Sequence, residues 1–474
     1  MEPLRSACYA PHSALYLRPD GLVHACCVSG FALGSVTGED RRSLRDMWDG
    51  SVLAAQRRKL EADSFELGCQ ECGIIESAGG REATVAYHFD RFADGAPHRF
   101  PKLLDLALSS RCNLQCVMCN GGLSSAIRTQ REGLPPMPDA YDDRFFEELE
   151  EFLPHVERLQ FKGGEPFIAP ENRRIWDFLI EHDLRPEISV TTNGTIFNER
   201  VEHYVRELRM HPNVSVDGVD PDTLESIRVG VDAEVLWNNI DRFQVLAEEA
   251  GNGMTLSFCL VQSNWREVGP FLVEADRRGL NCNVIFVNQP SRYDLLQLPV
   301  PELEAVIAEL SGTRPDLATG EARRAWDEVL ERLRAHLERP VAIVVRSALP
   351  MSTSEQASMR RDLVRRHGGE PLVALANDEE VVADLEVPSW SDWLQPSAFV
   401  GEPMDGIAGV IQERVGPLQI EVLPARRPGV EHLAIRVESS QGLHCLELYR
   451  FVDRPTGTYR AFVFELDPAP GTVG

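Results

Sequence analysis

Positive charge is scarce in this sequence of 474 residues. Lysine occurs only three times, and 74 acidic residues outnumber 48 lysines and arginines, which gives a formal net charge of −26. Such a surface repels phosphate, so nucleic acid and anionic membranes are disfavoured as partners. Long apolar runs are also missing, because no segment reaches the length of a membrane span and no signal-peptide pattern opens the sequence. We therefore expect a cytoplasmic protein with no nucleic-acid or membrane partner.

Cysteine is unevenly distributed along the chain. Eight of the eleven cysteines lie before residue 120, in clusters, and the other three are single. Where no export signal is present, clustered cysteines favour metal or redox cofactors over structural disulfides.

The densest cysteine motif follows an apolar run at residues 103–108 that is typical of a buried strand. Cys112, Cys116 and Cys119 come next, at the spacing C-x3-C-x2-C. Three thiolates on one loop can hold three corners of an iron–sulfur cube and leave the fourth iron open to a substrate or cofactor. A zinc knuckle, or partly disulfide-bonded cysteines, is the alternative interpretation.

Two further motifs end the next two predicted strands. The strand at 156–161 leads into the sequence KGGEP, and the strand at 188–191 leads into TNG. With the cysteine loop, they resemble the motifs of the radical S-adenosylmethionine (radical SAM) superfamily. The resemblance implies a 4Fe–4S cluster that binds S-adenosylmethionine (SAM) and cleaves it reductively. The deoxyadenosyl radical that is released then abstracts a hydrogen atom from an organic substrate.

The same resemblance implies roles for individual residues. Cys112, Cys116 and Cys119 would hold the radical-generating cluster. Five residues would bind SAM: Met118, Gly163, Gly164, Glu165 and Ser215. Met118 would give an apolar contact near the adenine, and Ser215 would contact the ribose. Glu165 could instead cap the following turn, and Ser215 could simply fill the barrel.

A single cysteine on the fifth predicted strand is a further candidate. Cys259 shares its face with Ser257 and Val261 by the alternation of strand residues. If that face points inward, its thiol could return a hydrogen atom to a substrate radical, as epimerases of this superfamily require. A small apolar core residue is the alternative, because buried cysteine usually has that role.

The first 80 residues carry a second cysteine set. A hairpin around Asp20-Gly21 leads to Cys26 and Cys27, and a helix at 43–50 precedes a C-x2-C knuckle. This pattern resembles the SPASM or twitch module of radical SAM enzymes, which binds an auxiliary 4Fe–4S cluster. The ligands that the resemblance implies are Cys8, Cys26, Cys69 and Cys72. Adjacent strand residues face opposite ways, so Cys26 and Cys27 should not both bind one cluster, and which of them does is open. Zinc is the alternative metal.

The pattern between residues 101 and 300 predicts the fold of the radical SAM core. Short apolar runs alternate with amphipathic helices in six βα units, with strands at 103–108, 156–161, 188–191, 213–218, 255–262 and 283–288. Such a series predicts an α/β fold, a partial (βα)6 parallel TIM-like barrel with its active site at the C-terminal strand ends. A doubly wound open sheet is the alternative. Asn264 and Glu267 also match the N-x2-E pattern of the superfamily.

The C-terminal third is less regular. Residues 301–368 are expected to form a helical connection, and residues 369–474 an antiparallel α+β domain. A PAS-like sensor or dimerisation domain is one interpretation of this last segment, and an anonymous capping domain is the other.

The predicted function is that of a radical SAM enzyme with oxidoreductase- or epimerase-type chemistry. The auxiliary cluster would assist electron transfer, and flavodoxin or ferredoxin would supply electrons. The substrate would be a peptide or a natural-product or sugar unit. A non-catalytic iron–sulfur redox sensor and a zinc-binding scaffold are the alternatives.

Overall fold

The computed structural model describes residues 4–338, apart from short gaps at 39–40, 66, 70–71, 74, 77–79, 95, 97 and 288–289. Beyond residue 338 it describes the backbone of five strands. The chain divides into two compact units, Met1–Val341 and Ala342–Gly474. Within the described ranges, no helix is long and apolar enough to cross a membrane.

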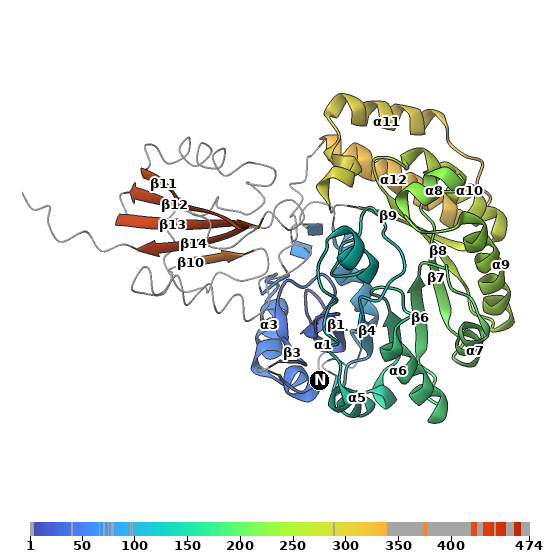
Figure 1. The fold of residues 1–474 in the computed structure, drawn as a ribbon, viewed down its shortest axis with the longest axis horizontal. Helices are drawn as coiled ribbons and strands as arrows, with labels where there is room; N and C mark the ends of the chain where they lie inside the picture. The colour runs from blue at the N-terminus through green and yellow to red at the C-terminus, as the bar shows by residue number, and fades with distance from the viewer. Residues whose placement is uncertain are drawn as a thin grey trace, which may run out of the picture. The chain divides into compact units, whose positions relative to one another are not determined.

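The first unit is built on one nine-stranded sheet (Figure 1), in the order β3-β2-β1-β4-β5-β6-β7-β8-β9. All neighbours from β1 through β4 to β9 are parallel. The bounds of the six core strands are β4 (Leu103–Leu106), β5 (Arg158–Phe161), β6 (Glu187–Thr192), β7 (His211–Ser215), β8 (Thr255–Leu260) and β9 (Asn281–Phe286). The six predicted strands are thus confirmed. Their order follows the chain without the reversal that defines a doubly wound sheet, and the sheet is open rather than closed.

The predicted N-terminal hairpin is an extension of this same sheet. Its strands are β1 (Ala14–Leu17) and β2 (Leu22–His24), which are antiparallel, and β3 (Ala32–Ser35) follows at the edge. β1 pairs in parallel with β4, so that Ala14 lies opposite Leu103 and Leu17 opposite Leu106. The cysteine-rich segment and the barrel strands therefore share a continuous backbone hydrogen-bond network.

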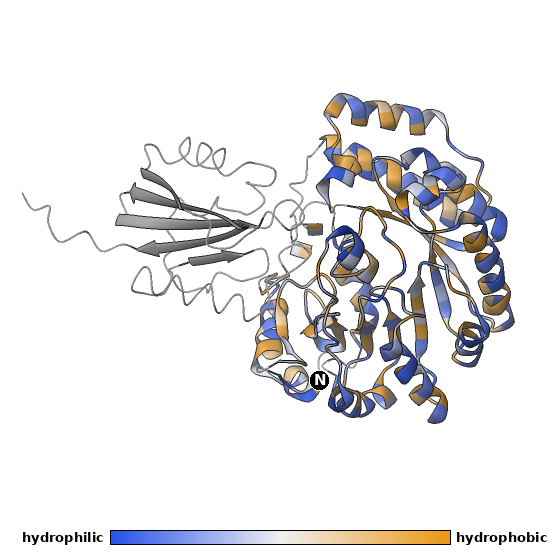
Figure 2. Ribbon diagram, viewed as in Figure 1, coloured by the Kyte–Doolittle hydropathy of each residue, from blue (hydrophilic) through white to orange (hydrophobic). Residues whose placement is uncertain are grey.

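Helices cover the outer face of the sheet, and polar and apolar residues alternate along them (Figure 2). In α9, Asp232 caps the first turn, and Leu236, Ile240 and Phe243 are buried at helical spacing. The α-helices of the first unit are α1 (Ala10–Ser13), α2 (Leu44–Trp48), α3 (Ser51–Glu61), α5 (Asp143–Glu150), α6 (Pro170–Glu181), α7 (Glu199–Glu207), α8 (Pro221–Ile227), α9 (Ala233–Glu249), α10 (Val268–Arg278), α11 (Val300–Gly312) and α12 (Gly320–Glu338). The 3-10 helices are η1 (Arg81–Ala83), η2 (Val85–Phe92), η4 (Leu153–His155), η5 (Trp265–Glu267), η6 (Ser291–Tyr293) and η7 (Leu295–Gln297), and η3 (Ile127–Arg131) is a π-helix.

The second unit contains an antiparallel sheet in the order β10-β14-β13-β12-β11. Its strands are β10 (Val373–Ala376), β11 (Gln419–Leu423), β12 (Val430–Ser439), β13 (Gly442–Phe451) and β14 (Tyr459–Glu465). The predicted antiparallel strands are confirmed. The PAS-like interpretation stays a prediction, as do the domain boundaries, and the part of the predicted helical connection beyond residue 338 lies outside the described residues.

Candidate functional site

The cysteine loop follows β4 and is held in place by backbone hydrogen bonds. Gln115 N–H donates to Val229 O and Val117 N–H to Ile227 O, both at 2.9 Å. Burial raises the pKa of each of the three loop thiols, and the neighbouring Cys116 raises that of Cys119 further, to about 12. The three predicted ligands are therefore gathered on one ordered loop, close enough to affect one another electrostatically.

The backbone of the GGEP segment lies directly beside this loop. Gly163 has φ +82°, a left-handed conformation that favours glycine, and a Cβ at Gly164 would collide with the carbonyl of Arg111. The next amide, Glu165 N–H, donates to that same Arg111 carbonyl at 2.7 Å. The two glycines thus bring bare backbone next to the residue that precedes Cys112.

The side chain of Glu165 connects the GGEP and TNG segments. It is 1% exposed, and its Oε1 accepts from Thr192 Oγ1 at 2.8 Å and from Phe167 N at 3.1 Å. Its Oε2 accepts from Asn193 N at 2.8 Å. Burial raises the pKa of this carboxyl, and the three donors oppose that rise. The bond from Phe167 N caps the turn after Glu165, which was the alternative role that the sequence allowed for this residue. Both carboxylate oxygens of Glu165 accept hydrogen bonds from the protein.

Asn193 extends this network to the cysteine loop. Its Nδ2 donates to Asn113 Oδ1 at 2.9 Å and lies 3.8 Å from Cys112 Sγ. The first cysteine of the motif therefore has an amide donor directed at its sulfur.

A buried ion pair lies on the other side of the loop. Asp217 and Arg228 are 0% and 6% exposed, and Asp217 Oδ2 is 2.7 Å from Arg228 Nε. Asp217 Oδ1 accepts from Cys259 N at 2.7 Å, and Arg228 Nη1 lies 4.0 Å from Cys116 Sγ. Burial alone would lower the pKa of Arg228, but Asp217 raises it well above its usual range, so the guanidinium is charged.

The N-x2-E pattern stabilises the strand ends at this place. Asn264 Nδ2 donates to the carbonyls of Asp217 and Cys259, both at 2.9 Å. Glu267 Oε2 accepts from Val219 N at 2.8 Å and from Asp220 N at 2.9 Å. Both side chains therefore bind backbone and fix the turn that carries Asp217.

The remaining predicted residues of the core lie near the same strand ends. Met118 and Cys259 are half-buried and pack against one apolar cluster built on Ile227, Val261 and Val287. Ser215 is half-buried at the end of β7, opposite Ser257 of β8. Burial raises the pKa of Cys259 well above its usual range, so its thiol is protonated.

The four predicted auxiliary ligands line one small cavity in the N-terminal segment: Cys8, Cys26, Cys69 and Cys72. Ala10 N–H and Gln56 Nε2 donate to the sulfurs of Cys8 and Cys69, each at 3.4 Å. Cys27, in contrast, is exposed and lies near Tyr16 and Lys162, whose pKa values it affects. Cys26 thus lines the cavity and Cys27 does not, but both lie in the turn after β2 rather than on a strand, so strand alternation is not the cause of this difference.

Two charged side chains, Lys162 and Asp105, lie on the inner face of the sheet beside Tyr16. Phe161 packs on Trp176 of α6, so the alternating Lys162 points inward. Its Nζ lies 2.6 Å from Asp105 Oδ2 and 5.1 Å from the centroid of the Tyr16 ring. Asp105 is 6% exposed, and among the described residues its Oδ1 has no hydrogen-bond partner.

Both cysteine sets fit iron–sulfur clusters by their donor chemistry. Each is a group of soft thiol ligands with N–H donors directed at sulfur. In the described part of the chain, no group of three or more histidine, cysteine, aspartate or glutamate side chains is spaced for a single metal ion. A cluster has a different requirement, because each of its cysteines binds a separate iron atom.

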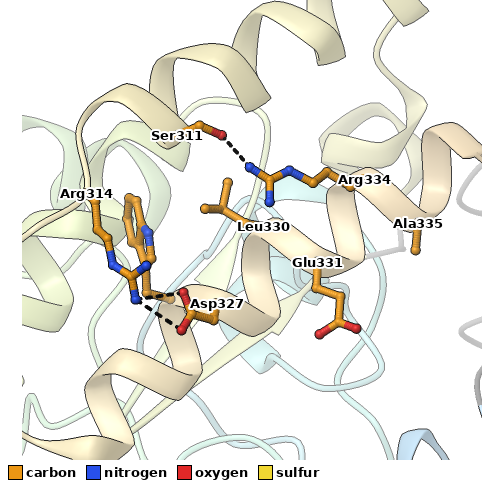
Figure 3. Close-up of a pocket in the computed structure, with 8 residues that line it drawn as sticks. Ser311, Arg314, Asp327, Leu330, Glu331, Arg334 and Ala335 are labelled. Carbon is orange, nitrogen blue, oxygen red and sulfur yellow. Dashed lines mark hydrogen bonds and ion pairs between the residues drawn. The ribbon is translucent and has the colours of Figure 1, made fainter.

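Of two surface hollows, one adjoins the cysteine loop and the other does not. One, of about 370 Å³, adjoins Cys112 and lies between residues 109–113 and 136–140. The other lies between α11 and α12 (Figure 3). It is lined by the apolar side chains Trp326, Leu330 and Ala335 and by charged and polar ones, with Arg314 2.9 Å from Asp327 and Arg334 2.8 Å from Ser311. It contains none of the predicted site residues.

Sequence reasoning missed three charged residues of this region. The sequence could have indicated a role for Asp105, because a carboxylate inside an apolar strand needs a charged or hydrogen-bonding partner. Lys162 and Arg228 gave no such signal, since nothing in their neighbours along the chain indicates that Lys162 lies against Asp105 or that Arg228 is buried.

Comparison with known proteins agrees with the motifs. Residues 106–251 match the model of the radical SAM superfamily, and residues 8–73 match that of an iron–sulfur cluster-binding domain, SPASM. Curated relatives include the GTP 3',8-cyclase of Clostridium botulinum, 24% identical over 139 residues, and that of Desulforamulus reducens, 27% identical over 148 residues. Each match covers 29% of this chain, and 42% and 41% of the relatives, so less than half of their length is matched.

Solved structures similar to this one include anSMEcpe with bound AdoMet, at 19% identity and a TM-score of 0.33, covering 45% of this chain and 62% of that one. Streptococcus suis SuiB bound to its precursor peptide SuiA has 14% identity and a TM-score of 0.33, with coverages of 62% and 59%. The two domain matches imply a 4Fe–4S cluster with SAM and an auxiliary iron–sulfur cluster. This chain therefore carries a radical SAM domain at residues 106–251, with a SPASM-type iron–sulfur cluster-binding domain ahead of it at residues 8–73.

Proposed function

We propose that this protein cleaves SAM reductively and uses the deoxyadenosyl radical to remove a hydrogen atom from an organic substrate. One observation carries the proposal: three cysteines, two bare glycines and the TNG asparagine converge at one edge of the sheet. When bound there, the 4Fe–4S cluster supplies the electron that breaks a C–S bond of SAM, which yields methionine and the radical. A donor such as flavodoxin or ferredoxin would provide that electron, in the cytoplasm.

Each residue near the loop has a proposed role. Cys112, Cys116 and Cys119 would hold the cluster. The backbone of Gly163 and Gly164 would approach the methionyl end of SAM, and Glu165 would keep that backbone in place through its three hydrogen bonds. Met118 and Ser215 would contact the adenine and ribose, as the superfamily resemblance implies.

The N-terminal cavity would hold the auxiliary 4Fe–4S cluster through Cys8, Cys26, Cys69 and Cys72. This cluster would accept an electron from a substrate radical during an oxidation, or shape the pocket. The choice of Cys26 over Cys27 is supported by their surroundings, because Cys26 lines the cavity whereas Cys27 is exposed.

The charged side chains Lys162 and Asp105 on the inner face of the sheet favour a polar substrate. Lys162 has donors beyond the one used for Asp105, and Asp105 keeps one oxygen without a described partner. A peptide or a sugar-like unit offers the matching acceptors and donors. We propose Cys259 as a hydrogen-atom donor to the substrate radical, supported by its protonated thiol near Met118. Unchanged product formation by Cys259→Ala would remove this role.

The test is formation of 5'-deoxyadenosine and methionine by anaerobically reconstituted protein reduced with dithionite. The wild type should form both. Cys116→Ser should form neither, because it lacks one cluster ligand. Cys282→Ser is the matched control, because Cys282 is a buried cysteine on β9, outside the loop, and this variant should still form deoxyadenosine and methionine.

The alternatives give different results in the same experiment. Iron-loaded protein that binds SAM but never releases deoxyadenosine would contradict the proposal and favour the redox sensor. Zinc with little iron would favour the scaffold.

A further inference from the structure

A single buried guanidinium lies against the sulfur of one loop cysteine. Arg228 is 6% exposed, and its Nη1 is 4.0 Å from Cys116 Sγ. Its position is fixed by the 2.7 Å ion pair with Asp217, which is itself held by the bond from Cys259 N. The backbone on either side of Arg228 also bonds the loop, through Ile227 and Val229. The cation therefore cannot move away from Cys116 without disrupting the loop.

The surroundings make this charge effective. A charge shielded from water interacts more strongly with its neighbours than an exposed one, because the local dielectric response is weaker. Arg131 shows the contrast on the same loop. It contacts the carbonyl of Cys119 at 2.5 Å and that of Cys116 at 3.3 Å, but it is exposed to solvent. Of these two arginines, Arg228 is the one whose charge is shielded from solvent.

We propose that the Asp217–Arg228 pair sets the reduction potential of the loop cluster, with Arg228 as a positioning residue that favours the reduced state. This inference rests on the proposed function. Gaining one electron makes the cluster more negative, and a fixed cation beside a ligand sulfur stabilises that state. Asp217 offsets part of this effect. Arg228 itself is neither oxidised nor reduced, and the electron comes from a one-electron donor such as dithionite.

Because the two residues carry opposite charges, removing each charge should shift the reduction potential of the cluster in an opposite direction. Reduction would be followed by electron paramagnetic resonance in the full-length, reconstituted protein, using the signal that SAM perturbs. Arg228→Gln should shift the potential to a more negative value, by about tenfold in the reduction equilibrium, or about 59 mV for one electron. Asp217→Asn should shift it to a more positive value. Arg228→Lys should keep most of the wild-type potential, because it retains the charge.

Arg131→Gln is the matched control, since it removes an exposed guanidinium from the same loop, and its shift should be less than about threefold. Shifts of the same sign in Arg228→Gln and Asp217→Asn would overturn the inference, and so would an unchanged potential in Arg228→Gln with normal iron content. If Arg228→Gln does not load iron, the sign of the Asp217→Asn shift decides.

Unchanged potentials with normal deoxyadenosine formation would refute this inference alone. Absence of deoxyadenosine from the wild type would refute the proposed function instead.

Discussion

Replacing Glu165 with alanine would remove the link between the GGEP and TNG segments. Three buried donors, Thr192 Oγ1, Phe167 N and Asn193 N, would lose their acceptor. Each unsatisfied buried group costs about 1–3 kcal/mol, so the loss in unfolding free energy for the three donors should be about 3–9 kcal/mol. Thr192→Val removes one of the three bonds, and also the bond that Thr192 Oγ1 accepts from Gly194 N at 3.1 Å, and should cost about 1–3 kcal/mol.

Urea unfolding of the cofactor-free protein is the appropriate assay, followed by far-UV circular dichroism. A double-mutant cycle should show that Glu165→Ala and Thr192→Val are not additive, because they share a bond, with a coupling of about 1 kcal/mol. Glu181→Ala is the control, since Glu181 is exposed at the end of α6, and its effect should be less than about 0.5 kcal/mol. A loss below about 1 kcal/mol for Glu165→Ala, or full additivity with Thr192→Val, would refute this account of Glu165.

Three further predictions concern other parts of the site. Cys26→Ser should lose the iron bound as the auxiliary cluster, whereas Cys27→Ser should retain it, as measured by the iron content of each protein after reconstitution. Lys162→Met should cost about 3 kcal/mol in urea unfolding, because it leaves a buried carboxylate without its cation. Replacing Asp105 with leucine in the same chain should restore most of that loss. The cofactor-free protein should lose stability as the pH rises above 9, because burial raises the pKa of Cys119 to about 12 and that of Cys282 to about 11, and the unfolded chain releases these protons first. A flat unfolding midpoint from about pH 8 to about pH 11 would contradict this.

The parts of the fold that were predictable are those encoded in contiguous segments. The six core strands are short apolar runs, and the helix at 320–338 has its apolar residues at helical spacing, so local sequence was sufficient. The pairing of β1 with β4 joins residues nearly ninety positions apart, and no local pattern specifies such a contact. Local patterns also do not specify that the end strands β3 and β9 stay apart and leave the sheet open.

The site divides in a similar way. The cysteine loop and the GGEP and TNG segments were identified because each is a run of adjacent residues. The role of Glu165 was left open, since its partners Thr192 and Asn193 lie on another strand end. The burial of Arg228 beside Cys116 was not predictable, because it depends on how the segment after α8 folds back on the cysteine loop.

The direct pairing of β1 with β4 limits how the N-terminal segment can be modified. A shortened chain that begins after residue 80 would uncover a row of unpaired N–H and C=O groups on β4, the strand that carries the cysteine loop. Such an edge invites pairing with other chains, so a truncated protein is expected to aggregate. For the same reason, exchanging this segment with that of another family member would require a matched β1 strand. Studies of the auxiliary cluster therefore call for point substitutions of its cysteines in the intact chain.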